Sequence, residues 1–191
     1  MEWRNENCLS CRCNTGSNTI TVLETLQKEL SQQAPDAEIT LLDLRKLNLV
    51  FSDGRDFREY NGDTRLVADT IMNADALIFG TPVYQASISG ALKNVLDLLP
   101  ARALADKVTT AVITAGSSHH FLVADYQLKP ILAFMKVVTL PSTLFVESKD
   151  IIDHEIVTDE IKLRVKRLAQ DLILTTNSYQ AQLQALEDEL F

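Results

Sequence analysis

Residues 80–100 read GTPVYQASISGALKNVLDLLP and join a strand pattern to a helix pattern. The stretch follows a short apolar run at residues 76–79, which suits a strand buried on both faces. From Ser89 the apolar residues recur with helical spacing until Pro100 ends the pattern. Pro82 and the small residues that follow it therefore predict a loop whose backbone groups can approach a flat ring closely.

Strand and helix patterns alternate along the rest of the chain as well. We expect helices at residues 17–33, around 66–71, at 121–135 and from 156 to about 190, and further strands at 39–44, 108–114 and 144–146. Pro130 should kink or widen its helix, and residues 175–178 are a candidate break in the last one. This alternation predicts a three-layer, doubly wound α/β fold with a mostly parallel sheet and ligands at the carboxyl ends of the strands.

Length and charge restrict the class of protein. The 191 residues, with 46% hydrophobic and 23% charged side chains, predict one domain over residues 1–191. The net charge of -8 opposes binding to nucleic acid. No apolar run is long enough for a membrane span and no signal peptide is recognisable, so we expect a soluble, cytoplasmic protein without a membrane partner.

Three cysteines, Cys8, Cys11 and Cys13, crowd the beginning of the chain. An odd and crowded set is a poor disulfide framework, so reduced thiols in a loop are expected. The C-x-x-C-x-C spacing leaves a metal or iron–sulfur site as the alternative, but such sites usually need four ligands and the chain has no fourth cysteine. We therefore expect no metal.

Two further loops carry polar groups that suit a ligand. Residues 14–19 read NTGSNT and combine hydroxyls with the start of a helix, as anion sites do, although Ser17 and Asn18 would serve equally as ordinary helix caps. Residues 114–120 read TAGSSHH and follow a buried strand, so this loop should lie beside the 80–90 loop. His119 and His120 are candidate hydrogen-bond donors there, or simply face solvent.

Four longer motifs resemble one known family. The segments TPVY at 81–84, SGALKN at 89–94, LDLLP at 96–100 and ADYQLKP at 124–130 resemble those of NADPH-dependent FMN reductases, especially the alkanesulfonate-utilisation type. The resemblance covers roughly residues 17–147. It implies an NAD(P)H-dependent oxidoreductase with FMN and NADPH or NADH as cofactors, and a flavodoxin-like, five-stranded sheet of order 2-1-3-4-5.

The resemblance also implies roles for particular residues. By position in the family motifs, the isoalloxazine ring would be lined by Pro82, Val83, Tyr84, Ser87, Gly116 and Ser117. Thr81 and His119 are two further candidate residues of the cofactor site. Ser17, Asn18 and Thr19 would hold the phosphate. Tyr126 corresponds to an inserted tyrosine that widens a helical turn at a subunit interface. A homodimer or homotetramer is implied, with a flavin-dependent monooxygenase as a further candidate partner, and no individually essential catalytic side chain is expected.

Residues 1–15 depart from the family pattern. Family members begin with an apolar strand and a Gly-Ser-Pro-Arg loop, whereas aligning Ser17 with the family puts Cys11 at the glycine, Cys13 at the proline and Asn14 at the arginine. The expected phosphate-binding arginine is therefore missing unless Arg12 substitutes. An altered reading frame in the encoding DNA is one hypothesis for this atypical segment.

Three other functions are compatible with these residues. An FMN-containing quinone or azo-dye reductase would share the fold and pass electrons to another acceptor. A flavin-binding electron carrier would show no turnover with NADPH. An iron–sulfur flavoprotein would explain the clustered cysteines but lacks its fourth ligand.

Overall fold

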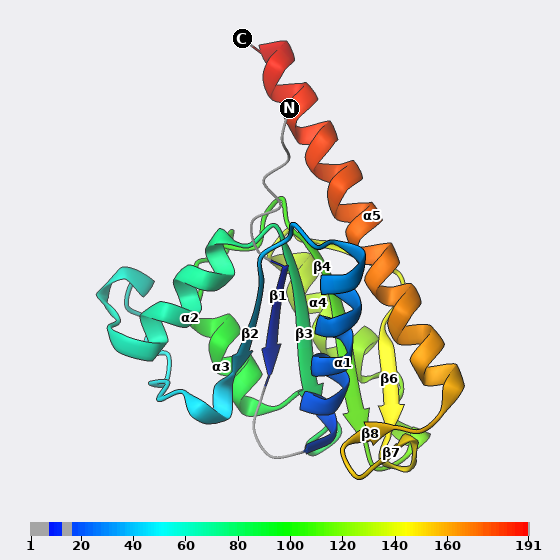
Figure 1. Ribbon diagram of the computed structural model, residues 1–191. Coiled ribbons are helices and arrows are strands. Elements are labelled where there is room, and N and C mark those ends of the chain that lie inside the picture. Colours follow the sequence, from blue (N-terminus) through cyan, green and yellow to red (C-terminus); the bar gives the residue numbers. More distant parts are fainter. Residues whose placement is uncertain (1–7, 13–16, 191) are drawn as a thin grey trace.

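A parallel β-sheet forms the centre of the molecule and helices cover both of its faces (Figure 1). The computed structural model describes residues 8–12 and 17–190, with the side chains of 18–189. The main strands are β1 Cys8–Arg12, β2 Ile39–Asp43, β3 Ala76–Pro82, β4 Val108–Ala115, β5 Val138–Thr139 and β6 Leu144–Glu147. They run in the order β2-β1-β3-β4-β5, and β6 also pairs with β4. All of these pairings are parallel.

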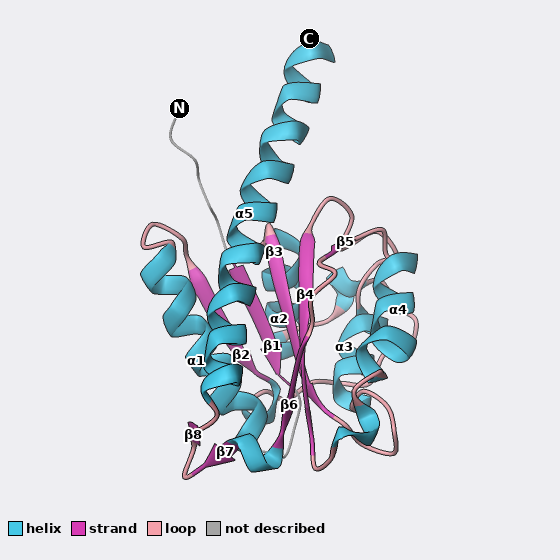
Figure 2. Ribbon diagram, turned by 90° about the vertical axis from the view of Figure 1, so that its right-hand side faces the viewer, coloured by secondary structure: helices cyan, strands magenta, loops and turns pink. Residues whose placement is uncertain are grey.

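Alternation along β3 divides the core into two layers. Ala76 and Ile78 belong to the apolar cluster under α1 Ser17–Gln33 and α5 Asp159–Leu190. Leu77 and Phe79 belong to the cluster under α2 Gly62–Asn73, α3 Gly90–Leu98 and α4 Lys129–Phe134. Because successive strand residues face opposite sides, a continuous apolar run fills both layers. Figure 2 shows the resulting helix–sheet–helix sandwich.

Helix α1 lies unusually close to β3, and glycine makes this approach feasible. A Cβ added to Gly80 would stand 2.5 Å from Cδ1 of Leu23, a side chain of α1 that is fully buried. A residue with a Cβ at position 80 would require the Leu23 side chain or its surroundings to shift. Gly80 therefore leaves room for Leu23 in the layer between α1 and the sheet.

The sequence anticipated most of this architecture. The expected α1 and α3, the helix around 66–71, and the strands β2, β3, β4 and β6 are all present. The helix with Pro130 is widened, as expected, because residues Ala124–Leu128 form a π-helical turn that precedes α4. A 3₁₀ turn at Ser118–His120 lies before this π-helical turn in the chain.

Two expectations about the carboxyl-terminal third were wrong. Helix α5 begins at Asp159, because Ile156 pairs with Ile151 in the small antiparallel pair β7 Ile151–Ile152 and β8 Glu155–Ile156. The helix also runs without a break through residues 175–178. There Thr176 and Ser178 donate their hydroxyls to the carbonyls of Leu172 and Leu174, so both are satisfied inside the helix.

The edge of the sheet beside β4 is divided in two. Strands β5 and β6 pair with opposite ends of β4, and Pro141 lies between them. Proline has no N–H to donate to a ladder, so it interrupts pairing at this edge. Among the described residues the sheet therefore contains six strands, whereas five were expected.

The last turns of α5 extend beyond the rest of the molecule in both views (Figures 1 and 2). Leu174 and Leu186 are exposed on this part of the helix. Among the described residues, no helix combines the length and apolarity that a membrane crossing needs.

Candidate functional site

The loop after β3 is held in one conformation by backbone hydrogen bonds. The N–H of Val83 donates to the carbonyl of Thr114 at 2.9 Å, which ties the loop to β4. Tyr84 and Ser87 exchange N–H···O bonds of 3.0 and 2.9 Å. Between them Gln85 and Ala86 have φ values of 48° and 59°, the left-handed conformation of a type I′ turn. Non-glycine residues adopt it at a cost of about 1–2 kcal/mol each, so the surrounding contacts must impose it.

Thr81 supports this loop from beneath. Its side chain is fully buried, and its hydroxyl donates to the carbonyl of Pro82 and accepts from the N–H of Ser89, at 2.9 and 3.1 Å. Ser89 in turn caps α3, because its hydroxyl accepts from the N–H of Leu92. One hydroxyl thus links both ends of the loop, and Thr81 acts as a positioning residue.

The loop after β4 stands beside the first, as the sequence predicted. Pro82 and Thr114 are partners in the parallel register, so both loops leave the same edge of the sheet. Gly116 is exposed, and no heavy atom lies within 4 Å of the place its Cβ would take. Ser117 Oγ lies 3.3 Å from Nδ1 of His119, whose side chain is exposed.

A third element, the first turn of α1, is connected to the same edge. Thr19 is fully buried, and its hydroxyl shares a 2.5 Å hydrogen bond with the hydroxyl of Thr114. This bond engages the Thr19 hydroxyl. The backbone N–H is therefore the Thr19 group that could take part in the expected phosphate binding. Asn18 is half-buried, and the Ser17 side chain lies outside the described residues.

Most of the expected site residues therefore lie on neighbouring loops. Residues 81–87 and 116–119 stand on adjacent strands, and residues 18 and 19 are joined to them through Thr114. Sequence reasoning missed Thr114 and Gln127. The hydroxyl of Ser87 donates to Oε1 of Gln127 in the π-helical turn, at 3.2 Å. Gln127 adjoins Tyr126 in the motif at residues 124–130, and that motif was the available signal for it.

These groups suit a flat, neutral heteroaromatic ring. The described donors and acceptors around the two loops are hydroxyls, an amide and an imidazole, with Tyr84 as an aromatic surface that is 39% exposed. The open space at Gly116 lets a ring approach the backbone. The residues present fit the isoalloxazine of FMN.

A metal site finds no support in the described side chains. No group of three or more His, Cys, Asp or Glu gathers among them. Strand β1 contains Cys8 and Cys11, whose side chains lie outside the described residues, as does Cys13 entirely. The expectation that the cysteines occupy a loop was wrong for Cys8 and Cys11, because their segment pairs with β2 and β3 as a strand. The state of the thiols and the side chains of Arg12 and Asn14 fall outside the described part of the chain.

Fold and site together define a flavodoxin-like α/β protein. The chain is similar to a flavodoxin from the domain Archaea, with a TM-score of 0.57 over 90% of this chain and 99% of that one, at 12% identity. At this identity the likeness concerns the fold alone.

The family follows from the sequence comparison. The family model for NADPH-dependent FMN reductases matches residues 8–150, and the chain belongs to this family. It is 36% identical to an NAD(P)H-dependent FAD/FMN reductase of Geobacillus thermodenitrificans strain NG80-2, over 83% of this chain and 86% of that protein. Among solved structures it is similar to the apo form of the NADH:FMN oxidoreductase EMOB, with a TM-score of 0.72, 27% identity, and coverage of 87% and 89%.

Membership confirms the resemblance drawn from the four motifs. It also confirms the expectation of an oxidoreductase that combines FMN with a reduced nicotinamide. The match begins at Cys8, so it includes β1 and part of the atypical segment.

Proposed function

We propose that this chain transfers hydride from NADPH or NADH to FMN and passes reduced flavin to a monooxygenase, with the site at the carboxyl edge of β3 and β4. The observation that carries the proposal is the hydrogen bond from Val83 N–H to Thr114 carbonyl, because it holds the loop after β3 against the end of β4, where the second loop begins. When bound, FMN supplies the hydride-accepting chemistry. The protein's task is to orient the ring and the nicotinamide and to exclude competing reactions.

Each loop has a separate part in this proposal. Thr81 fixes the β3–α3 loop so that Pro82, Val83 and Tyr84 present a rigid surface to the ring. Ser87 and Ser117 offer hydroxyls to its polar edge, with His119 at the rim. Gly116 leaves room for the nicotinamide or the ring to stack. Ser17, Asn18 and Thr19 hold the phosphate through the first N–H groups of α1.

Binding measurements test these assignments directly. Tyr84→Ala and Ser87→Ala should weaken FMN binding and slow NADPH oxidation, whereas Phe51→Ala, at an 86% exposed aromatic in the β2–α2 loop, should change neither. If both site variants bind FMN as the unmodified protein does, the site assignment is wrong.

Steady-state kinetics tests the electron acceptor. Sequential kinetics with free FMN as a substrate is expected of a reductase that supplies a monooxygenase. Ping-pong kinetics with tightly held FMN would instead favour quinone or azo-dye substrates. Absence of NADPH oxidation in the presence of FMN would favour an electron carrier.

A homodimer or homotetramer is part of the same proposal. Phe121, Tyr126 and Phe134 are 57%, 72% and 71% exposed along the segment that contains the π-helical turn. Burial of such apolar groups favours association, and the widened turn supports the alkanesulfonate-utilisation type. Size-exclusion chromatography with light scattering should give two or four chains per particle, and Tyr126→Arg should give fewer.

We also propose that residues 1–191 form one domain. Strands β5 and β6 together take the fifth place of the order 2-1-3-4-5, since both pair with β4. Limited proteolysis should then release no stable fragment smaller than the β1–α5 unit.

A further inference from the structure

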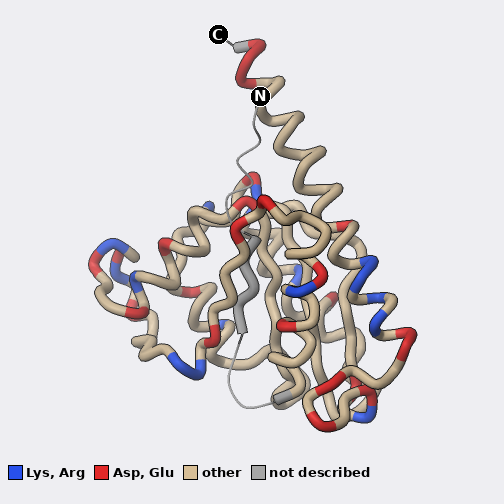
Figure 3. The backbone as a smooth tube through the Cα atoms, viewed as in Figure 1, with Lys and Arg blue, Asp and Glu red and all other residues tan. Residues whose placement is uncertain are grey.

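A small cavity lies beside the candidate phosphate site, at the carboxyl end of β2. It measures about 300 Å³ and is lined by Ile20 and Glu24 of α1 and by residues 41–47. Ligand pockets begin at about this size. In the sequence, the basic residues Arg45 and Lys46 follow the acidic Asp43 at the end of β2, and Figure 3 shows blue next to red there.

Asp43 holds Arg45 in a defined orientation. Its carboxylate accepts from Nε of Arg45 at 3.0 and 3.3 Å and from Nη2 at 2.7 Å, and it also accepts from the Arg45 backbone N–H. Asp43 is buried, so this anchor is rigid. The hydrogen bond to Asp43 raises the pKa of Arg45, which keeps the guanidinium charged.

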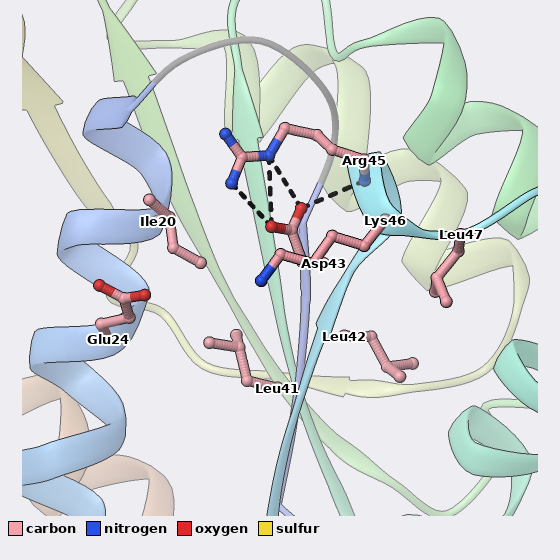
Figure 4. Close-up of a pocket in the computed structure, with 8 residues that line it drawn as sticks. All are labelled: Ile20, Glu24, Leu41, Leu42, Asp43, Arg45, Lys46 and Leu47. Carbon is pink, nitrogen blue, oxygen red and sulfur yellow. Dashed lines mark hydrogen bonds and ion pairs between the residues drawn. The ribbon is translucent and has the colours of Figure 1, made fainter.

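The clamp leaves one edge of the guanidinium available. A guanidinium has five N–H donors, and the Asp43 carboxylate takes one from Nε and one from Nη2. The edge formed by Nη1 and Nη2 remains, and Nη1 makes no hydrogen bond to any described residue. In Figure 4 this guanidinium extends across the end of β2 toward the first turn of α1. A planar pair of N–H groups matches two oxygens of a phosphate.

The other charged groups of the cavity decide what kind of ligand fits. Glu24 lies on α1 one turn beyond Ile20, while Lys46 adds a second cation beside Arg45. The negative charges of Asp43 and Glu24 thus equal the positive charges of Arg45 and Lys46 in number. An anionic ligand would therefore bind at the edge of Arg45 that faces away from Asp43. A compact dianion satisfies that geometry better than a carboxylate, because it can also use the first N–H groups of α1.

We propose that Arg45, oriented by Asp43, binds the phosphate monoester of a nucleotide. Two phosphate monoesters are available to an enzyme of this family, the 5′-phosphate of FMN and the 2′-phosphate of NADPH. The inference rests on the proposed function, since it assumes that one of these nucleotides binds at this edge.

The experiment compares ligands that differ only by the phosphate. Dissociation constants for FMN and riboflavin are measured by flavin fluorescence, and those for NADPH and NADH by calorimetry. Arg45→Ala should weaken binding of one phosphorylated ligand about tenfold and leave its unphosphorylated counterpart unchanged. Arg45→Lys should fall between, because lysine keeps the charge but not the planar fork.

The chain provides a matched control in Arg58. It follows Asp56 in the same Asp-x-Arg arrangement, and that carboxylate also accepts from its Nε and Nη2. Arg58 does not line the cavity at β2. Arg58→Ala should therefore leave all four dissociation constants unchanged, and the urea midpoint of this exposed control variant should agree with that of the unmodified protein.

The two sources of phosphate give different results. A changed FMN-to-riboflavin ratio identifies the FMN phosphate, and a changed NADPH-to-NADH ratio identifies the 2′-phosphate. If Arg45→Ala changes neither ratio while the unmodified protein binds FMN and oxidises NADPH, the inference is wrong and the proposed function stands. If the unmodified protein binds neither nucleotide, the proposed function fails first.

Discussion

The loop after β3 and the turn after β2 lie at the same edge of the sheet but are held by different forces. The first is fixed by buried hydrogen bonds of Thr81 and by the backbone link from Val83 to Thr114. The second is fixed by the ion pair between Asp43 and Arg45, whose side chain is 33% exposed. Buried neutral hydrogen bonds barely respond to salt, whereas exposed charges do. The proposed ring end of the site is thus held by buried hydrogen bonds, and the proposed phosphate end depends on charge.

The largest expected effect follows from removing the hydroxyl beneath the ring loop. Thr81→Val leaves the Ser89 N–H and the Pro82 carbonyl without their buried partner, which should lower the free energy of unfolding by about 1–3 kcal/mol. Urea denaturation measures this loss. Thr81→Ser keeps the hydroxyl and should lose much less. Equal losses in both variants would mean that the methyl group, and not the hydroxyl, fixes the loop.

The next effect separates ring binding from phosphate binding. Gly116→Val places a side chain in open space at the ring end, so the urea midpoint should stay the same. FMN and riboflavin should both bind about tenfold more weakly, because they share the ring. This outcome contrasts with Arg45→Ala, which should affect one phosphorylated ligand. A loss for FMN but not for riboflavin would contradict the placement of the ring beside Gly116.

Salt concentration should have a smaller effect, and it should change the affinity for FMN more than the affinity for riboflavin. Raising NaCl from about 0.05 M to about 0.5 M shortens the screening length from above 10 Å to below 5 Å. FMN binding should weaken several-fold, while riboflavin binding changes by less than about twofold. Fluorescence titrations at both salt concentrations measure this. Parallel losses for the two flavins would show that charge does not distinguish their binding.

The smallest effect concerns strain in the type I′ turn. Ala86→Gly relieves the positive φ of 59°, and after the entropy of glycine is subtracted the free energy of unfolding should rise by about 0.5 kcal/mol. Ala91→Gly, inside α3, is the control and should lower it by about 0.5–1 kcal/mol. A loss for Ala86→Gly would mean that the methyl group makes a contact worth more than the strain.

The elements that the sequence predicted well are those with strong patterns. Strands β3 and β4 could be predicted because every residue in them is buried, which gives a continuous apolar run. Helices α1 and α3 could be predicted because each buries one apolar stripe with helical spacing. Strand β1, with the sequence CLSCR, was almost unrecognisable because it lacks such a run. Its place between β2 and β3 is decided by pairing on both sides.

The candidate site divides in the same way. Thr81, Pro82, Tyr84 and Gly116 could be proposed from the sequence, because each belongs to a motif at the carboxyl end of a strand. Gln127 and Arg45 were not, because their role depends on which distant segments they meet. Residues 175–178 were misjudged for a related reason, since helix propensity ignores hydroxyls that bond back to the helix.

By itself, the sequence determined the family, the alternation of strands and helices, and the motifs at the ends of β3 and β4. Apolar periodicity and turn residues are local properties, and they act through a few neighbouring positions. Only the tertiary structure decided that Thr19 bonds to Thr114 and that Arg45 stands beside α1. Such contacts join segments far apart in the chain, and parallel pairing of β1, β2, β3 and β4 brings them together.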